Sequence, residues 1–229
     1  MVKELILYHG SENIIEKPIY GYGKKNNDFG LGFYCTENNE SAKEWACSSL
    51  SNGFSNKYSI DISDLNVLDL NSPEYNVLNW ITILVTHRIF KIKTPIAGRA
   101  IKYLTENFYI DVDAYDIIIG YRADDSYFDF ADSFLNNGIN VNELASALKL
   151  GNLGMQIVIK SEYAFSKLKF LGYEIAMSEK YFVKRKSRND EANKLYYNIL
   201  NSNSKGLYIN DITEGMVKNN DSRIQKNAD

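Results

Sequence analysis

The chain has 229 residues, of which 45% are hydrophobic, 13% aromatic and 24% charged, so it can form one large domain with a sizeable core. Its formal net charge of −3 excludes the global basic field that attracts nucleic acid. Two cysteines, Cys35 and Cys47, are too few for a disulfide framework or a zinc site, and we expect both to be packing residues. No secretion signal and no apolar run of roughly 20 residues is recognisable, which predicts a cytoplasmic protein that does not enter membranes.

Strands and helices are predicted in an irregular order. In chain order, the apolar patterns predict a strand over 3–9, a loop over 11–27, a strand over 30–36, a helix over 40–50, strands over 57–62 and 66–70, helices over 76–92 and 97–107, a strand over 115–120, helices over 128–136 and 142–150, and strands over 155–160 and 171–176. Because no regular βαβ alternation appears, the pattern favours an α+β fold over a doubly wound sheet.

The charge is distributed unevenly along the chain. Residues 180–229 carry ten Lys or Arg against six Asp or Glu, a net charge of +4, so residues 1–179 carry −7. We therefore predict a domain over 1–179 and a polar, basic extension over 180–229, with one apolar patch over 207–217. The run from Lys180 to Arg188 interleaves basic and aromatic residues, which indicates either a surface for nucleic acid or an acidic partner, or a solvated helix or strand end.

Two glycine-marked motifs stand in the first fifty residues. The first strand ends in His9-Gly10-Ser11, and the second is Gly30-Leu31-Gly32-Phe33-Tyr34, with Trp45 eleven residues after Tyr34. Neither Gly-x-Gly pair, at 21–23 or at 30–32, opens a helix after a strand as a Rossmann turn requires. One interpretation is strand ends, tight turns and core aromatics; the other is a pocket for a nucleotide.

These motifs resemble the NAD-binding half of the ADP-ribosyltransferase fold, in the branch of diphtheria toxin and poly(ADP-ribose) polymerase. A late strand of that branch carries a catalytic Glu, and the matching position here is Gln156, in 155–159. Residues 4–170 as a whole resemble an uncharacterised bacterial family of this superfamily, in which Gln is usual at this position and a strand ends in the pattern seen at 120–125. The resemblance implies a split β-sandwich with flanking helices.

The resemblance also implies that NAD+ is the substrate and that no metal takes part. The residues that it places on NAD+ are His9, Gly10, Ser11, Tyr34, Trp45 and Gln156. His9, Tyr34 and Gln156 form the implied catalytic set: His9 bonds the adenosine ribose, and Gln156 bonds the 2′-hydroxyl of the nicotinamide ribose. Tyr34 and Trp45 offer ring faces to the cationic nicotinamide, and Gly10 and Ser11 hold its carboxamide.

The glutamine at position 156 stands where the better-known relatives have a glutamate. An amide can form the same hydrogen bond as a carboxylate but brings no charge to the developing cation. Asp124 and Asp125 are candidates for an acid/base role or for contact with the acceptor; the alternative is a solvated helix N-cap. Arg122 is a candidate for the pyrophosphate, and His87 is expected to be structural.

The sequence thus predicts an enzyme that transfers ADP-ribose from NAD+ to a protein or nucleic acid and releases nicotinamide. Such an enzyme would act as a bacterial toxin, a defence effector or a regulator, with an antitoxin or another cognate protein as a candidate partner. The alternative, favoured by Gln156, is a weak or inactive module that binds NAD+. A third hypothesis is a purely protein-binding member of a toxin–antitoxin pair.

Overall fold

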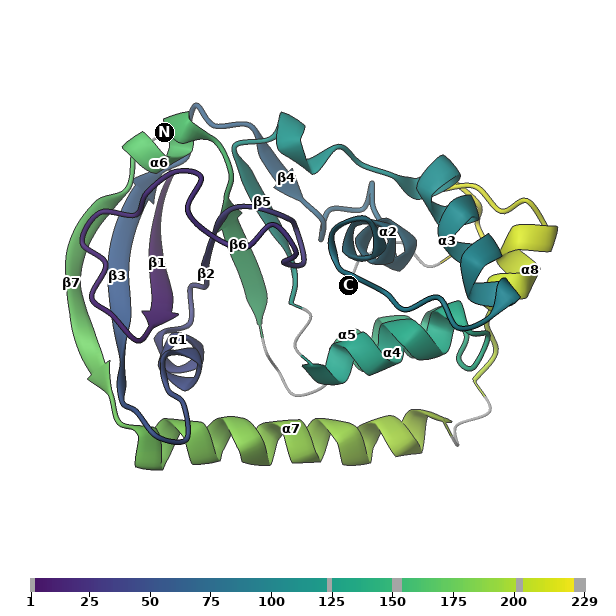
Figure 1. Cartoon of the computed structure of the whole chain (residues 1–229). Helices are drawn as coiled ribbons and strands as arrows, with labels where there is room; N and C mark the ends of the chain where they lie inside the picture. The colour runs from purple at the N-terminus through teal and green to yellow at the C-terminus, as the bar shows by residue number, and fades with distance from the viewer. Residues whose placement is uncertain (1–2, 123–124, 150–153, 201–203, 225–229) are drawn as a thin grey trace.

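The computed structural model describes residues 3–122, 125–149, 154–200 and 204–224, without the side chains of 125–127 and 200, and shows two sheets beside a group of helices (Figure 1). The first sheet is antiparallel, in the order β1 (Glu4–Ser11), β3 (Gly53–Asp61) and β7 (Lys169–Ala176). The second has the order β2 (Phe33–Cys35), β6 (Met155–Ile159), β5 (Ile117–Tyr121) and β4 (Val67–Asp69), and only β4 and β5 are parallel. The predicted α+β class is confirmed.

The described helices lie between and around these strands. They are α1 (Asn39–Ala46), α2 (Val77–His87), α3 (Pro95–Phe108), the short 3-10 helix η1 (Val112–Ala114), α4 (Asp125–Leu135), α5 (Val141–Leu148), α6 (Glu162–Ser166), α7 (Ser178–Leu200) and α8 (Ile209–Glu214). Many begin at a polar side chain that accepts a hydrogen bond from a backbone N–H of the first turn; examples are Asn38, Asn76, Thr94, Asn140 and Ser161. None of the described helices is long and apolar enough to cross a membrane.

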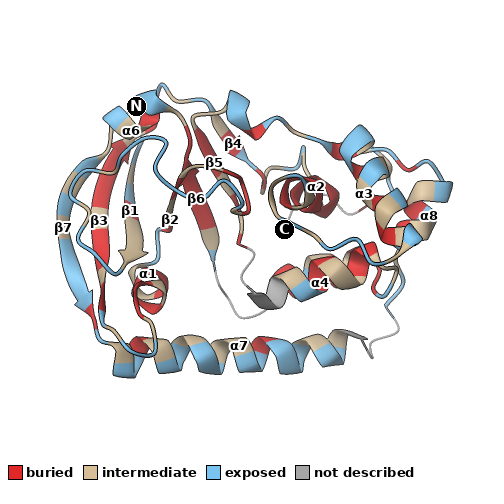
Figure 2. Ribbon diagram, in the orientation of Figure 1, coloured by how far each residue is buried: buried red, intermediate tan, exposed pale blue. Residues whose placement is uncertain are grey.

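The second sheet is buried on both faces, which explains why its strands read as continuous apolar runs. Ile157 and Ile159 of β6 pack against Leu7 and Tyr58 of the first sheet. Val158, which points the other way, joins the core formed with α2–α5 and α8. Figure 2 shows β5, β6 and α2 as largely buried elements in the middle of the molecule. Side chains on the helical face of β6 therefore lie between a sheet and a helical layer.

The largest difference from the prediction lies after residue 176. The segment described above as a polar, basic extension contains the 23-residue helix α7 and the short helix α8. Ile209, Ile212 and Val217 are buried in the helical core. In Figure 1, α7 runs along one side of the molecule, from the end of β7 past α1 and on toward α4 and α5. The extension is thus folded onto the rest of the chain.

A second difference lies in the strands. The structure begins β3 at Gly53, where the pattern predicted 57, and limits β2 to Phe33–Cys35, where it predicted 30–36. Gly30 has a left-handed φ of 74°, which extended backbone does not allow. The residues before β2 therefore form a turn, and this turn helps to build the site.

Gly10 allows α1 to lie directly on β1. A Cβ at this position would overlap the Ala42 carbonyl oxygen of α1 and come within 2.9 Å of the Ala46 nitrogen. Both neighbours are backbone atoms, which cannot rotate away. The glycine is therefore required by packing, whatever else it does.

We predict that Gly10→Ala lowers the free energy of unfolding by about 1–3 kcal/mol, the scale of overpacking a core. Gly98→Ala is the matched control, because a Cβ there meets only Ile92 Cγ2 at 3.6 Å and alanine favours the helix α3. Urea unfolding of both variants measures the difference. Equal stability of Gly10→Ala and the parent would contradict the close approach of α1.

Candidate functional site

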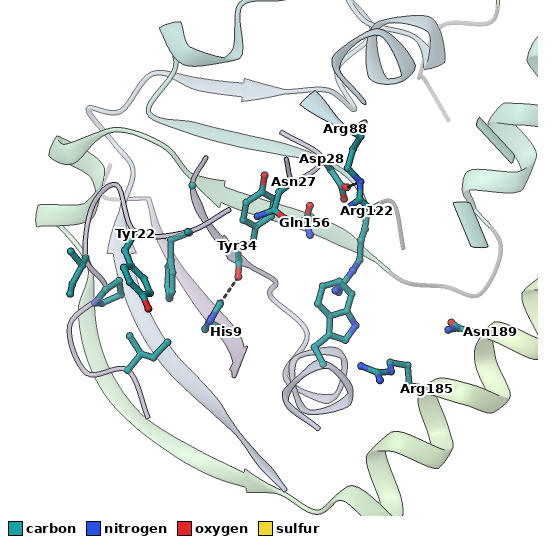
Figure 3. A pocket seen from close by; sticks show the side chains of 17 residues that line it. His9, Tyr22, Asn27, Asp28, Tyr34, Arg88, Arg122, Gln156, Arg185 and Asn189 are labelled. Carbon is teal, nitrogen blue, oxygen red and sulfur yellow. Dashed lines mark hydrogen bonds and ion pairs between the residues drawn. The ribbon is translucent and has the colours of Figure 1, made fainter. Parts of the chain in front are cut away.

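A cleft of about 650 Å³ opens between the two sheets, α1 and α7 (Figure 3). Its size lies within the range of small-molecule sites. His9, Tyr34, Trp45 and Gln156 all line it. The structure therefore brings together four of the six residues that the sequence placed on NAD+, although they come from β1, β2, α1 and β6.

The cleft exists because β1 and β2 pair only briefly. Tyr8 and Thr36 exchange two backbone hydrogen bonds, of 2.7 and 3.0 Å, and the chain then leaves β2 and enters α1. Backbone groups of an antiparallel strand alternate between its two edges. Because those of Tyr8 point away from β3, those of Gly10 point the same way. Gly10 also lines a small cavity of about 70 Å³ that His9, Trp45 and Gln156 share.

His9 presents a hydrogen-bond acceptor to the cleft. Its Nδ1 lies 2.7 Å from the Tyr34 carbonyl oxygen, which can only accept, so Nδ1 carries the proton and Nε2 has a free lone pair. Burial lowers the pKa of His9 from its ordinary value of 6.5, against the opposing effect of that hydrogen bond. The ring also packs on Phe33, with centroids 4.3 Å apart. This neutral, oriented imidazole is suited to a sugar hydroxyl.

Tyr34 offers a ring face and uses its hydroxyl internally. The hydroxyl donates to the Gly30 carbonyl at 2.6 Å and accepts from the Phe29 N–H at 3.1 Å. Burial raises its pKa, so it stays protonated. The His87 Nδ1 forms a hydrogen bond of 2.9 Å with the Ile83 carbonyl oxygen. The ring lies so close to Gly30 that a Cβ on residue 30 would be 2.5 Å from the His87 Cδ2. His87 thus supports the turn that holds Tyr34, the structural role expected of it.

Gln156 is the polar exception in an aliphatic strand. It pairs with Gly120 across β5 and β6, shares the helical face with Val158, and is only 5% exposed. Its Oε1 is buried and has no hydrogen-bond partner among the described residues. A buried acceptor without a donor costs about 1–3 kcal/mol. An acceptor of this kind, next to a cleft, indicates a ligand that donates a hydrogen bond.

Other predicted residues lie differently. Ser11 is not among the cleft residues, because its hydroxyl bonds the backbone of Asn13 at 2.8 and 2.9 Å. The Arg122 guanidinium lies against the Trp45 ring. Asp124 lies outside the described residues, and Asp125 begins α4 with its side chain outside the description.

Some cleft residues were not predicted from the sequence. Asp28, before the Gly30 turn, forms an ion pair with Arg88 at 3.2 Å. Arg185 and Asn189 project toward the cleft from α7 (Figure 3). Their spacing of four residues on one helix face is the only sequence signal, and it is not specific. Among the described residues, three arginines and one aspartate line the cleft, a positive balance although the chain is acidic.

The comparisons with known proteins place the chain in a family. Residues 5–170 match DUF3990, a family of proteins of unknown function. The chain belongs to DUF3990. This confirms the predicted membership in an uncharacterised family, and no curated protein and no solved structure matches the chain. The DUF3990 region contains His9, Tyr34 and Gln156, whereas Arg185 and Asn189 lie beyond it.

We predict that His9 makes this DUF3990 protein sensitive to mild acid. Because the folded-state pKa lies below 6.5, the unfolded chain binds the proton first as the pH falls, and stability decreases from about pH 6.5 downward until the folded-state pKa is passed. His9→Gln removes this effect, so its melting temperature should fall less than that of the parent between pH 7.5 and pH 5.5. Equal decreases in both proteins would show that His9 is not buried in its neutral form.

Proposed function

We propose that the cleft binds NAD+ and transfers its ADP-ribose to a macromolecular acceptor, with release of nicotinamide. The observation that carries the proposal is the buried, unpartnered Oε1 of Gln156 in the same cleft as a neutral His9 and the ring of Tyr34. A ribose hydroxyl can supply the missing donor. The resemblance of the two early motifs and of the Gln156 strand to ADP-ribosyltransferases supports the same ligand.

The cleft offers groups that suit both kinds of group in NAD+. A primary carboxamide has a donor and an acceptor side by side, and the N–H and C=O of Gly10 at the open strand edge are complementary to it. The Tyr34 ring gives the cationic nicotinamide a face worth about 0.5–2 kcal/mol. The arginines of the cleft suit the diphosphate, which carries the negative charge of the ligand.

In the proposed reaction, the bond between nicotinamide nitrogen and ribose C1′ breaks and the electron pair leaves with the neutral nicotinamide. A nucleophile of the acceptor forms the new bond to C1′ and loses its proton. Gln156 would accept a hydrogen bond from the 2′-hydroxyl and orient the ribose. Its amide adds no negative charge to stabilise the developing cation. The acceptor nucleophile must therefore take part early, and hydrolysis without an acceptor should be slow.

A second candidate function is an NAD+-binding module without turnover. The uncharged amide of Gln156 favours it. Incubation of the purified protein with NAD+ labelled in the adenylate and with a cell extract separates the two functions. Label on protein or nucleic acid supports the transferase, and binding without release of nicotinamide supports the module. A role as toxin, defence effector or regulator would then follow from the labelled acceptor.

We expect Tyr34→Leu to weaken NAD+ binding by about 1–2 kcal/mol, the scale of a lost ring contact. Tyr34→Phe is the control: it keeps the ring but leaves the Phe29 N–H and the Gly30 carbonyl without their partner, so it should lower stability more than affinity. Calorimetric titration and thermal melting measure the two effects. Unchanged affinity in Tyr34→Leu would return the residue to a purely structural role.

Gln156 gives the sharpest test of the reaction. Gln156→Ala should abolish transfer while the protein remains folded, because the amide makes no hydrogen bond through Oε1 that the fold needs. Gln156→Glu should raise the hydrolysis of NAD+ to free nicotinamide, since a carboxylate stabilises the developing cation without an acceptor. A folded Gln156→Glu protein that hydrolyses NAD+ no faster than the parent would favour the binding module.

A further inference from the structure

The helix α7 lies outside the DUF3990 region and yet forms part of the cleft. The family match ends at residue 170, whereas α7 spans Ser178–Leu200. Arg185 and Asn189 line the cleft from the middle of this helix, and Figure 3 shows both side chains on the side of α7 that faces it. The family region alone therefore leaves one wall of the cleft open.

The basic residues of α7 divide into two groups by their partners. Lys184 contacts Glu40 at 3.3 Å and Glu44 at 3.5 Å, and Arg188 also pairs with Glu44. These contacts attach α7 to α1. Arg185 has no carboxylate within ion-pair distance among the described residues, and its guanidinium lies 5.3 Å from the Phe182 ring centroid. Arg185 is thus a half-buried cation that α1 does not neutralise.

The other two arginines of the cleft are engaged with its walls. Arg88 forms its ion pair with Asp28, and Arg122 lies against Trp45. Arg185 differs from Arg88 in that its guanidinium has no carboxylate partner among the described residues. Its planar guanidinium matches two oxygens of a phosphate, and the Asn189 amide, one turn further along α7, adds another donor.

We propose that Arg185, assisted by Asn189, binds the diphosphate of the dinucleotide, so that α7 completes the nucleotide site of this chain. The inference rests on the proposed function and adds to it a binding element outside the family region. A phosphate in this place would neutralise the Arg185 charge in the way that Glu44 neutralises Arg188. The nicotinamide and its ribose would then lie toward β1 and β6, where the uncharged groups of His9 and Gln156 are.

The test compares ligands with and without phosphate. Calorimetric titrations of the full chain use NAD+, ADP-ribose, ADP and adenosine against the parent and Arg185→Ala. Lys186→Ala is the matched control, because it removes the same charge from the exposed side of the same helix. We expect Arg185→Ala to weaken the three phosphate ligands about tenfold or more, as for a lost charged hydrogen bond, and to leave adenosine unchanged. Lys186→Ala should change none of them by more than about twofold.

The conservative variant sharpens the result. Arg185→Lys keeps the charge but loses the planar fork, so its affinity for ADP should fall between those of the parent and Arg185→Ala. Thermal melting checks that each variant is folded, and Asn189→Ala offers a second, neutral change on the same face. Its expected effect is a smaller loss for the same three ligands.

The failures are distinguishable. A parent that binds neither NAD+ nor ADP-ribose would refute the proposed function itself. A parent that binds them, together with an Arg185→Ala protein of unchanged affinity for ADP, would overturn only the role of Arg185. Equal losses of affinity in Arg185→Ala and Lys186→Ala would also overturn it, since they would indicate a general electrostatic effect of positive charge on α7. Normal NAD+ binding by Arg185→Ala with reduced labelling of the acceptor would assign Arg185 to the acceptor and not to the nucleotide.

Discussion

The short contact between β1 and β2 determines the rest of the site. One backbone bridge connects Tyr8 of β1 with Thr36, the residue directly after β2, and beyond it the chain turns into α1. The glycine at position 10 is what allows α1 to enter this gap, because a side chain there would overlap its backbone. If β1 and β2 paired over a longer stretch, the N–H and C=O of Gly10 would form hydrogen bonds with the neighbouring strand. The separation instead leaves an open strand edge beside His9 and within reach of Gln156, and a cleft forms in a part of the molecule that would otherwise be continuous sheet.

The polar groups of the cleft are of two kinds. Three are uncharged: an imidazole kept unprotonated by burial, a phenol whose pKa is raised, and an amide with a free acceptor. The charged groups are three arginines and Asp28. Arg88 follows α2 and pairs with Asp28, Arg122 follows β5, and Arg185 lies on α7. A ligand with an uncharged sugar and a charged phosphate meets both needs.

Sequence patterns predicted the elements whose signals are local. The apolar runs of β5 and β6 and the helical stripes of α2 and α3 depend on residue types at fixed spacings, whereas the cluster of His9, Tyr34, Trp45 and Gln156 was implied by the resemblance to a known family. The partners of those residues could not be read in this way. That Ser11 bonds Asn13, that Arg122 lies on Trp45, and that β2 is only three residues long all follow from tertiary packing. The carboxylates assigned at Asp124 and Asp125 gain no support, since the structure does not describe their side chains.

The helix α7 was hidden from the sequence for a physical reason. A helix on a core shows a continuous apolar stripe. The inward residues of α7 are apolar at Tyr181, Ala192 and Ile199, but those between Tyr181 and Ala192 face α1 and the cleft and are charged or polar. Arg188 and Lys184 form ion pairs with the buried Glu44, and Arg185 lines the cleft. A buried carboxylate is tolerated only with its cations in place, so α1 fixes the position of α7. The interruption of the apolar stripe that concealed the helix is therefore the same feature that places an arginine at the cleft.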